Sequence, residues 1–264
     1  HSLWCLGAQR KGMVIQMNNK YIVSLLAAGI LLLSLAGCGE NKEVVATKNA
    51  IDSIGEVTID SQDVIEQAEA LYNNLPTEDQ QAVTNYDVLV EARNEYDILC
   101  AETAIDAIGE VTSKSGETIE YAKKLYEALS LEQQKQVQNY DSLNNADEKY
   151  TFIEVGIGSE TGWDYFSFSE DDMTIEKVGE PDALEDFGDY FKLYKAVESE
   201  INYIFEKLNL PDSLLKKVRS TSSKDGTLSE RHNNVLITWS YDPMRDNSLY
   251  IQFKYEPTAK LNVV

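Results

Sequence analysis

The chain is poor in the residues that build metal, redox and nucleophilic sites. Its 264 residues include three cysteines and two histidines, one of which is His1. A structural zinc site uses four Cys or His ligands, so we expect no bound metal and no other cofactor. Neither a Gly-x-Ser-x-Gly sequence nor a phosphate-binding glycine loop is present, and we predict no catalytic residue.

Positive charge is also scarce. The chain has 23 lysines and arginines against 45 aspartates and glutamates, which gives a net charge of −22. Nucleic acids and anionic lipid headgroups are bound by clusters of basic side chains, so we expect neither as a partner. The hydrophobic content of 43% is nevertheless sufficient for folded cores.

Acidic residues are absent from the first 37 positions. This segment contains Met17–Lys20 with one lysine, an apolar run over Tyr21–Leu35, and then Ala36 and Gly37 before Cys38. A basic start, an apolar stretch and small residues before a cleavage position are typical of a secretory signal peptide. The alternative is a transmembrane helix, which needs about 20 apolar residues and is therefore longer than this run.

The tetrapeptide Leu35-Ala36-Gly37-Cys38 resembles the lipobox of bacterial lipoproteins. The resemblance implies cleavage before Cys38, a thioether bond from its sulfur to diacylglycerol, and acylation of the new amino group, for example with palmitate. It implies a lipid-anchored protein on the extracytoplasmic side of the cell membrane. Two acyl chains anchor stably, because each buried CH₂ contributes about 0.8 kcal/mol.

These observations divide the N-terminal region into three parts. We interpret residues 1–16 as upstream, non-native sequence, 17–37 as the signal peptide and 38–43 as a tether, with Met13 as the alternative start to Met17. After cleavage only Cys38 and Cys100 carry thiols. With Cys38 lipidated no intramolecular disulfide is expected, and Cys100 is predicted to be an inert buried thiol in a helix, with a redox role as the alternative.

The middle of the chain is an internal repeat. The sequence AIDSIGEVT at 50–58 recurs as AIDAIGEVT at 104–112, and alignment of 46–99 with 100–153 gives 24 identical pairs without a gap. Such self-similarity indicates two copies of one supersecondary unit, which we place at 44–99 and 100–154.

Each copy predicts a small helical bundle. Ser61 is the expected N-cap of a helix with apolar residues in steps of three and four, and a short helix follows, ending near Asn85 in the first copy and Asn139 in the second. A longer helix is predicted over 87–108, because no glycine or proline interrupts it. Its apolar residues form two opposite stripes: Leu89, Ala92, Tyr96 and Leu99, and Ile98, Ala101, Ile105 and Ile108.

One helix would therefore belong to both bundles, which predicts a semi-rigid stalk. The repeat pattern AIDxIGxVT…LYxxL…EQxxxVxNYxxL resembles small helical repeats in surface and secreted proteins of gut-type Gram-positive bacteria. The resemblance covers 46–153 and implies fold and extracellular location, but no catalytic or ligand residues. Residues 39–154 carry 8 basic against 25 acidic side chains, as expected of a solvated, self-repelling surface.

Residues 155–264 predict a separate α+β domain, because the helical period ends and aromatic residues become frequent. Strands are expected over 163–169, 173–178, 235–241 and 249–255, with Glu170–Asp172 as a turn. A long helix is expected from about 179 to 208, and a shorter one over 212–219. The polar stretch 220–234, including His232, is interpreted as a loop. The economical arrangement is an antiparallel sheet with the long helix on its apolar face.

The function predicted from these features is that of a non-enzymatic lipoprotein whose helical stalk presents an α+β binding module. Met244 and Arg245 in the 242–248 loop and Tyr250 on the open sheet face are the candidate interaction residues. The partner would be an envelope or extracellular protein or glycan. The alternative is a lipid-tethered hydrolase of cell-wall or extracellular polymers, whose triad would have to be built around His232.

Overall fold

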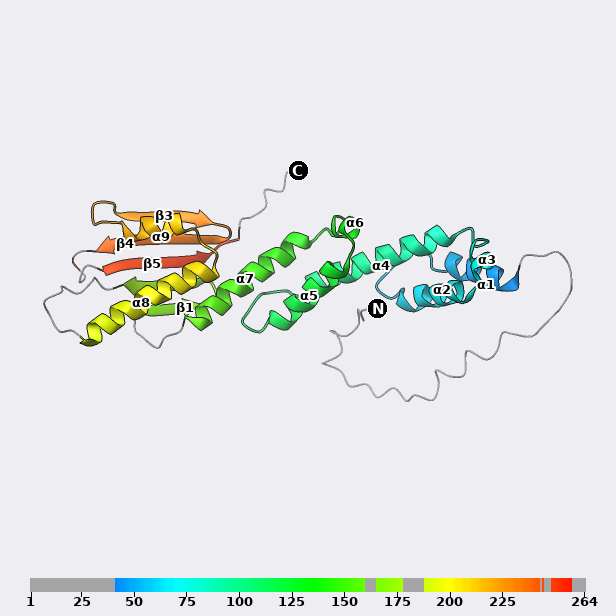
Figure 1. Cartoon of the computed structure of the whole chain (residues 1–264), viewed down its shortest axis with the longest axis horizontal. Coiled ribbons are helices and arrows are strands. Elements are labelled where there is room, and N and C mark those ends of the chain that lie inside the picture. The colour runs from blue at the N-terminus through cyan, green and yellow to red at the C-terminus, as the bar shows by residue number, and fades with distance from the viewer. Residues whose placement is uncertain (1–40, 160–164, 178–187, 243, 245–247, 258–264) are drawn as a thin grey trace. The chain divides into compact units, whose positions relative to one another are not determined.

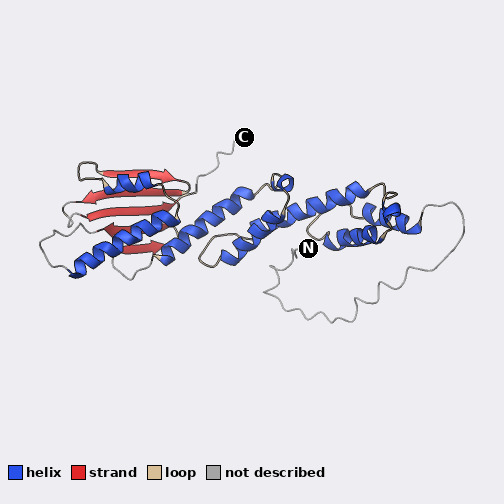
Figure 2. Cartoon of the chain, viewed as in Figure 1, coloured by secondary structure: helices blue, strands red, loops and turns tan. Residues whose placement is uncertain are grey.

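The structure is a computed structural model, and it describes residues 41–159, 165–177, 188–242, 244 and 248–257. The described residues form nine helices and one five-stranded antiparallel sheet (Figures 1 and 2). The described residues divide into two compact units. The first contains 41–104 and 123–138, and the second contains 105–122 and the described residues from 139 onward.

Seven helices precede the sheet. They are α1 (Lys42–Asp52), α2 (Gln62–Asn74), α3 (Thr77–Gln80), α4 (Tyr86–Asp106), α5 (Gly116–Ala128), α6 (Leu131–Gln134) and α7 (Tyr140–Gly158). The starts of α2, α3 and α4 lie 54 residues before those of α5, α6 and α7, which is the offset of the sequence repeat. Helix α1 begins at Lys42, inside the segment predicted as a tether, and the Asn41 side chain caps it by accepting a hydrogen bond from the Glu43 N–H (3.0 Å).

Matching polar contacts occur at the repeat offset. The Gln80 side chain donates to the carbonyl oxygens of Tyr72 and Leu75 at the end of α2 (both 3.2 Å). Gln134 donates in the same way to the carbonyl oxygens of Tyr126 and Leu129 (3.2 and 3.1 Å). Carbonyls at a helix C-terminus lack partners within the helix, so each glutamine satisfies them and fixes the following short helix.

The short helices end at Gln80 and Gln134, earlier than the predicted ends near Asn85 and Asn139. These two asparagines directly precede α4 and α7 and contact the ends of earlier helices. Asn85 donates to the Asp52 carboxylate (2.7 Å), and Asn139 donates to the Asp106 carboxylate (2.8 Å). Ser61 stands at the N-cap position of α2, but its hydroxyl does not cap the helix as predicted. It accepts instead from the backbone N–H of Thr58 (2.9 Å), which closes the turn before α2.

Helix α4 has two buried faces, as the sequence predicts, but Leu99 and Ile98 of the predicted stripes are only half-buried. Its N-terminal half contributes Leu89, Ala92, Tyr96 and Cys100 to an apolar core that also contains buried residues of α1 and α2. The second stripe is also buried, at Ala101, Ala104, Ile105 and Ile108. The burial of Cys100 confirms its predicted position, but the prediction of a free thiol is wrong, because Cys100 is disulfide-bonded.

The sheet and two helices form a two-layer α+β arrangement. The strands are β1 (Phe166–Ser169), β2 (Asp172–Lys177), β3 (Thr227–His232), β4 (Val235–Asp242) and β5 (Ser248–Tyr255), in the order β1-β2-β5-β4-β3. Helices α8 (Gly188–Lys207) and α9 (Asp212–Arg219) cover one face (Figure 1). The predicted helix 212–219 and the β4–β5 pair are confirmed, whereas the expected start of the long helix lies outside the described residues.

Two expectations for this region are wrong. The polar stretch 220–234 contains β3, which joins β4 through a tight turn at Asn233 and Asn234, with Asn233 at a φ of 51°. His232 is therefore the last residue of an edge strand, paired with Val235, and not a loop residue. The helical period also does not end at Val155, since α7 continues to Gly158.

Two glycines near the end of α7 permit close packing. A Cβ atom on Gly156 would lie 2.0 Å from the ring of Phe168 in β1, and one on Gly158 would lie 2.6 Å from the Tyr203 hydroxyl in α8. Any larger residue would push these aromatic side chains away. Glycine thus lowers the helix propensity of this turn but brings α7 against the sheet and α8.

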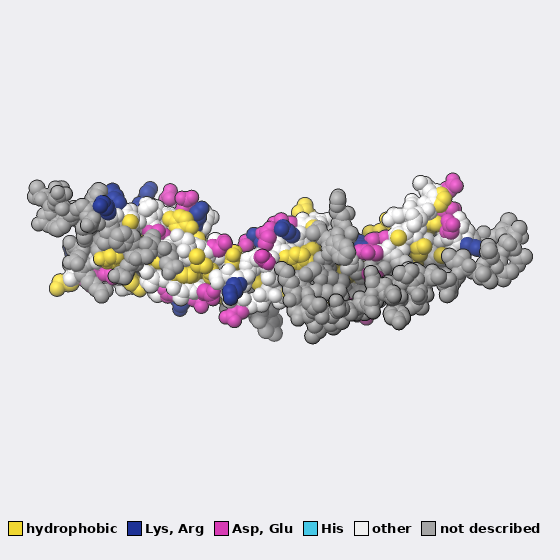
Figure 3. Space-filling view, turned by 90° about the horizontal axis from the view of Figure 1, so that it is seen from below, with side chains coloured by type: hydrophobic (Ala, Val, Ile, Leu, Met, Phe, Trp, Pro, Cys, Tyr) yellow, Lys and Arg dark blue, Asp and Glu magenta, His cyan; other side chains and the backbone are white. Residues whose placement is uncertain are grey.

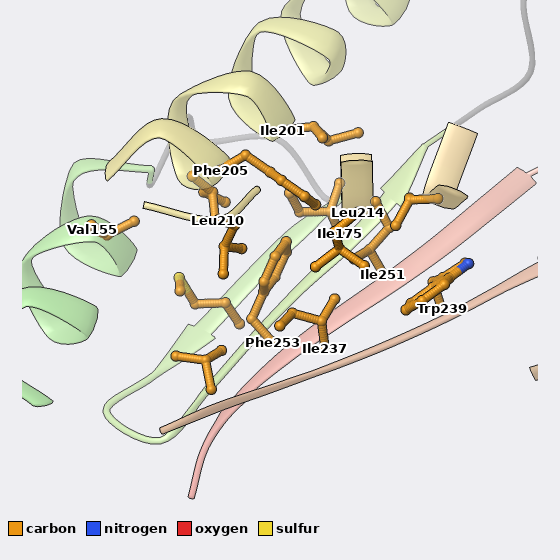
Figure 4. Close-up of a cluster of buried hydrophobic side chains, with 14 of the residues drawn as sticks. Val155, Ile175, Ile201, Phe205, Leu210, Leu214, Ile237, Trp239, Ile251 and Phe253 are labelled. Carbon is orange, nitrogen blue, oxygen red and sulfur yellow. The ribbon is translucent and has the colours of Figure 1, made fainter. Parts of the chain in front are cut away.

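The core of the module contains residues of α7 as well as of α8, α9 and the sheet (Figure 4). Phe152 and Val155 of α7 are 0% and 4% exposed and belong to this core. The sequence predicts an apolar face of eight residues on β4 and β5, of which seven are buried and Tyr241 is half-buried. The buried residues are Val235, Ile237, Trp239, Leu249, Ile251, Phe253 and Tyr255. The last helix before the sheet is therefore an integral part of the α+β core.

A partly buried polar network fixes α7 to the end of the sheet. The side-chain amide of Asn234 donates to Asn145 Oδ1 (3.0 Å) and to the carboxylate of Glu148 (2.7 Å). The Tyr255 hydroxyl donates to the carbonyl oxygen of Asn145 (2.8 Å). Lys149 pairs with Asp171 in the β1–β2 turn. Since these groups satisfy one another, the network holds one orientation of the helix on the sheet.

The module should lose stability in alkaline solution through Tyr255. Burial, aided by the nearby Glu148 carboxylate, raises the pKa of the Tyr255 hydroxyl to about 12. An unfolded tyrosine titrates near pH ~10, so this contribution is complete below pH ~10 and is lost as the pH rises toward ~12. We expect a loss on the order of 1–2 kcal/mol over that range. Chemical denaturation at several pH values should show a shallower alkaline slope for Tyr255→Phe, and equal slopes would contradict this assignment.

Candidate interaction surface

The sheet face opposite α8 and α9 is polar, and we call it the outer face. Strand register defines its residues, because directly paired residues of antiparallel strands share a face. They are Ser167, Ser169, Asp172, Thr174, Glu176, Thr227, Ser229, Arg231, Leu236, Thr238, Ser240, Asp242, Ser248, Tyr250, Gln252 and Lys254. All of them except the buried Ser248 are exposed or half-buried. This is the face on which sequence reasoning placed Tyr250.

One row of uncharged hydrogen-bonding side chains crosses the entire outer face. In this order, the five residues are Ser167, Thr174, Gln252, Thr238 and Ser229, one from each strand. Neighbouring strands are about 4.8 Å apart, so the row is about 19 Å long. We call it the hydroxyl-amide row. It presents donors and acceptors together, because each hydroxyl and the amide can act as both.

The charges beside this row partly compensate one another. The outer face carries two cations, Arg231 and Lys254, and three carboxylates, Asp172, Glu176 and Asp242. Glu256 accepts hydrogen bonds from both Arg231 (2.5 Å) and Lys254 (2.9 Å), and the amide of Gln252 donates to Asp172 (2.6 Å). Acidic and basic side chains are also interspersed on the surface shown in Figure 3. With Glu256 included, two cations face four carboxylates, so the outer face carries only a small part of the net charge of −22 of the chain.

The predicted interaction residues do not all lie on this face. The Tyr250 side chain is 40% exposed and lies next to the hydroxyl-amide row, opposite Ser240 and Glu176. Met244 is 92% exposed and lies in the β4–β5 connection. Arg245 lies outside the described residues, as do the lipobox residues Leu35, Ala36, Gly37 and Cys38.

A cavity of about 570 Å³ lies in the first unit, between α2, α4 and α5. The residues of this cavity come from three helices and follow no sequence motif, so the sequence alone does not predict it. Glu69 and Arg93 form a two-pronged ion pair on its wall (both contacts 2.7 Å), and Tyr96 donates to Gln62 (3.2 Å). Burial raises the pKa of the nearby Asp97 carboxyl. Several of the polar groups on its wall are therefore already paired with one another.

The residues needed for hydrolysis do not converge on His232. Within the described ranges, its side chain forms no hydrogen bond with a serine or a carboxylate, and no group of three or more His, Cys, Asp or Glu side chains is placed to hold a metal ion. Of the predicted turn Glu170–Asp172, the first two residues join β1 to β2, and Asp172 is the first residue of β2. The Glu170 carboxylate accepts a hydrogen bond from the backbone N–H of Ser113 (3.0 Å).

Comparison with known proteins gives no relative for this chain: no family model, no curated protein and no solved structure matches it. Among the helices that the structure describes, none is long and apolar enough to cross a membrane. Any functional conclusion therefore rests on the sequence pattern and on the geometry of the two units.

Proposed function

We propose that the protein is a bacterial lipoprotein, anchored at Cys38 on the extracytoplasmic side of the cell membrane. The supporting observation is Leu35-Ala36-Gly37-Cys38 directly after residues 17–34, which contain one lysine, an apolar run and no acidic residue. Helix α1 begins at Lys42, so the chain between the proposed lipid and the first helix is short. A diacylglyceryl group plus an N-acyl chain would hold the protein stably at the membrane surface.

The helical part serves as a stalk in this proposal. Its support is helix α4, whose 21 residues carry one buried stripe for the first bundle and a second stripe, including Ile105, for the next. Helix α7 continues in the same manner from Tyr140 into the core of the module at Phe152 and Val155. Continuous helices transmit position along the chain better than flexible loops do.

The α+β module is the part that binds a partner. The outer face supports this role, because it is polar, lacks a covering helix among the described elements, and carries an exposed aromatic residue, Tyr250. A solvated sheet face of this kind suits recognition. The proposed function is therefore the display of a binding surface from a lipid anchor.

Changing Cys38 to alanine tests the anchor. The variant lacks the sulfur that accepts diacylglycerol, so we expect it to be recovered in the medium or the soluble envelope fraction, with almost none in membranes. The measurement is immunoblotting of fractionated cells. Cys100→Ala is the matched control, because it removes a disulfide-bonded cysteine of helix α4 and leaves the proposed lipid acceptor in place, and it should remain in the membrane fraction. Stable membrane attachment of the Cys38→Ala protein would contradict the lipoprotein proposal and favour a transmembrane segment.

A further inference from the structure

The outer face has the chemistry of a surface for neutral sugars. Its hydroxyl-amide row offers five side chains that donate and accept hydrogen bonds, and none of the five is charged. Sugar hydroxyl groups are donors and acceptors of the same kind. A phosphate-bearing ligand would need unpaired cations, whereas Arg231 and Lys254 are both engaged with Glu256.

The geometry of the row fits an extended chain. The five side chains come from consecutive strands, so they form a line across the sheet that is about 19 Å long. Thr174 and Ser167 are hydrogen-bonded to each other, which orders one end of this line. A rigid sheet holds the line without loop rearrangement, and prior ordering reduces the entropy lost on binding.

Tyr250 supplies the apolar component. It lies beside the hydroxyl-amide row, two residues before Gln252 on the same strand. Its partners on the neighbouring strands are Ser240 and Glu176, and 40% of its side chain is exposed. An aromatic ring can pack against the C–H face of a sugar ring while its hydroxyl remains in water. Apolar contact at one side and hydrogen bonds along a line together define a surface for a polyhydroxylated chain.

The net charge of the protein favours an uncharged polymer as the ligand. At −22, the molecule repels polyanions at low ionic strength, and this disfavours envelope polymers that carry phosphate or carboxylate groups. We propose that the outer face binds a neutral extracellular polysaccharide, with the chain lying across the strands along the hydroxyl-amide row. The inference rests on the proposed function, since it names the ligand class for the module that the anchor would display.

Affinity electrophoresis of the full chain in a non-ionic detergent tests the proposal. Native gels would contain xyloglucan, galactomannan or pullulan as neutral polysaccharides, and polygalacturonate as an acidic one. At least one neutral polysaccharide should retard the protein, equally in low and high salt, because no ion pair is formed. Polygalacturonate should not retard the protein. Absence of retardation by all three neutral polymers, or retardation by polygalacturonate alone, would overturn the inference.

Variants separate this surface from the rest of the molecule. Tyr250→Ala and Thr238→Val should each weaken the retardation by about fivefold or more, since a contact that contributes ~1 kcal/mol changes affinity by that factor. Thr238→Val keeps the shape and the strand preference of the residue while removing its hydroxyl. Tyr140→Ala is the matched control: Tyr140 is also 40% exposed but lies at the start of α7.

The outcomes also distinguish this inference from the proposed function. Unchanged retardation in both Tyr250→Ala and Thr238→Val would overturn the assignment to the outer face. If Tyr250→Ala abolished capture of a protein partner on cells while no neutral polysaccharide bound, the ligand class would be wrong and the display function would stand. Membrane release of the Cys38→Ala protein is independent of either result.

Discussion

Replacing Phe152 with alanine should destabilise the whole α+β module, although the residue lies in a helix that continues from the repeat region. Its side chain is fully buried, belongs to the module core, and packs against the ring of Tyr255 with ring centroids 5.9 Å apart. Truncation of a buried phenylalanine removes apolar contacts and leaves a cavity, which costs about 3–5 kcal/mol. The sheet should therefore lose protection although no strand is altered.

Hydrogen exchange resolved by segment measures this effect. In Phe152→Ala, the amides of β2, β4 and β5 should exchange faster by about two orders of magnitude or more, because 1.4 kcal/mol corresponds to a factor of ten. Ile157→Ala is the control on the same helix, since Ile157 is 49% exposed, and its effect should stay within about 0.5 kcal/mol. Unchanged exchange of the sheet in Phe152→Ala would show that the module folds without α7.

Aspartate at Leu89 and at Ile105 should have large but separate effects. Each residue is 2% exposed, and both lie on the continuous helix α4. A carboxylate at either position would be buried without a partner, which costs several kcal/mol. Since Leu89 belongs to the core formed with α1 and α2, Leu89→Asp should expose those helices to exchange. Ile105→Asp should instead increase amide exchange in the second repeat.

A neighbouring position provides the control for charge alone. Val88 is 48% exposed, so Val88→Asp adds the same carboxylate next to Leu89 in contact with water. It should leave exchange in α1 and α2 within a few-fold of the parent protein. Identical exchange patterns for Leu89→Asp and Ile105→Asp would contradict the division of α4 into two buried stripes.

The sequence predicted helices well where apolar periodicity was strong. Helix α4 covers 86–106 against a predicted 87–108, and α9 has the predicted bounds of 212–219. Strands β4 and β5 were found because apolar and polar residues alternate over seven or more positions. In each case burial of a regular stripe decides the local structure, and the stripe is visible in the sequence.

Strand β3 was missed for a physical reason. Its inward-facing positions are Leu228, Glu230 and His232, so the alternation that marks a half-buried strand is absent. It exists as a strand because β4 offers it an edge and the Asn233-Asn234 turn returns the chain. The end of α7 was misjudged for the opposite reason: Gly156 and Gly158 disfavour a helix locally, but they allow contact with Phe168 and Tyr203. Tertiary packing outweighed local preference at both places.

The candidate surface was predictable only in part. Alternation placed Tyr250, Gln252 and Thr238 together on an open face, because they belong to two strands joined by a short loop. The hydroxyl-amide row also needs Ser167, Thr174 and Ser229. Their alignment depends on the pairing of β2 with β5, which are far apart in sequence, and on the existence of β3. Strand order and register between distant segments follow from the assembled core and not from any local pattern.

Mass spectrometry of the mature N-terminus tests the central proposal most directly. The protein would be purified from membranes of the cells that produce it, digested, and its most hydrophobic N-terminal peptide sequenced. The proposed function predicts a peptide that begins at Cys38 and carries a diacylglyceryl group on the cysteine sulfur. A mature chain that retains residues 17–37, or one that begins at Cys38 or beyond without lipid, would contradict the proposed anchor.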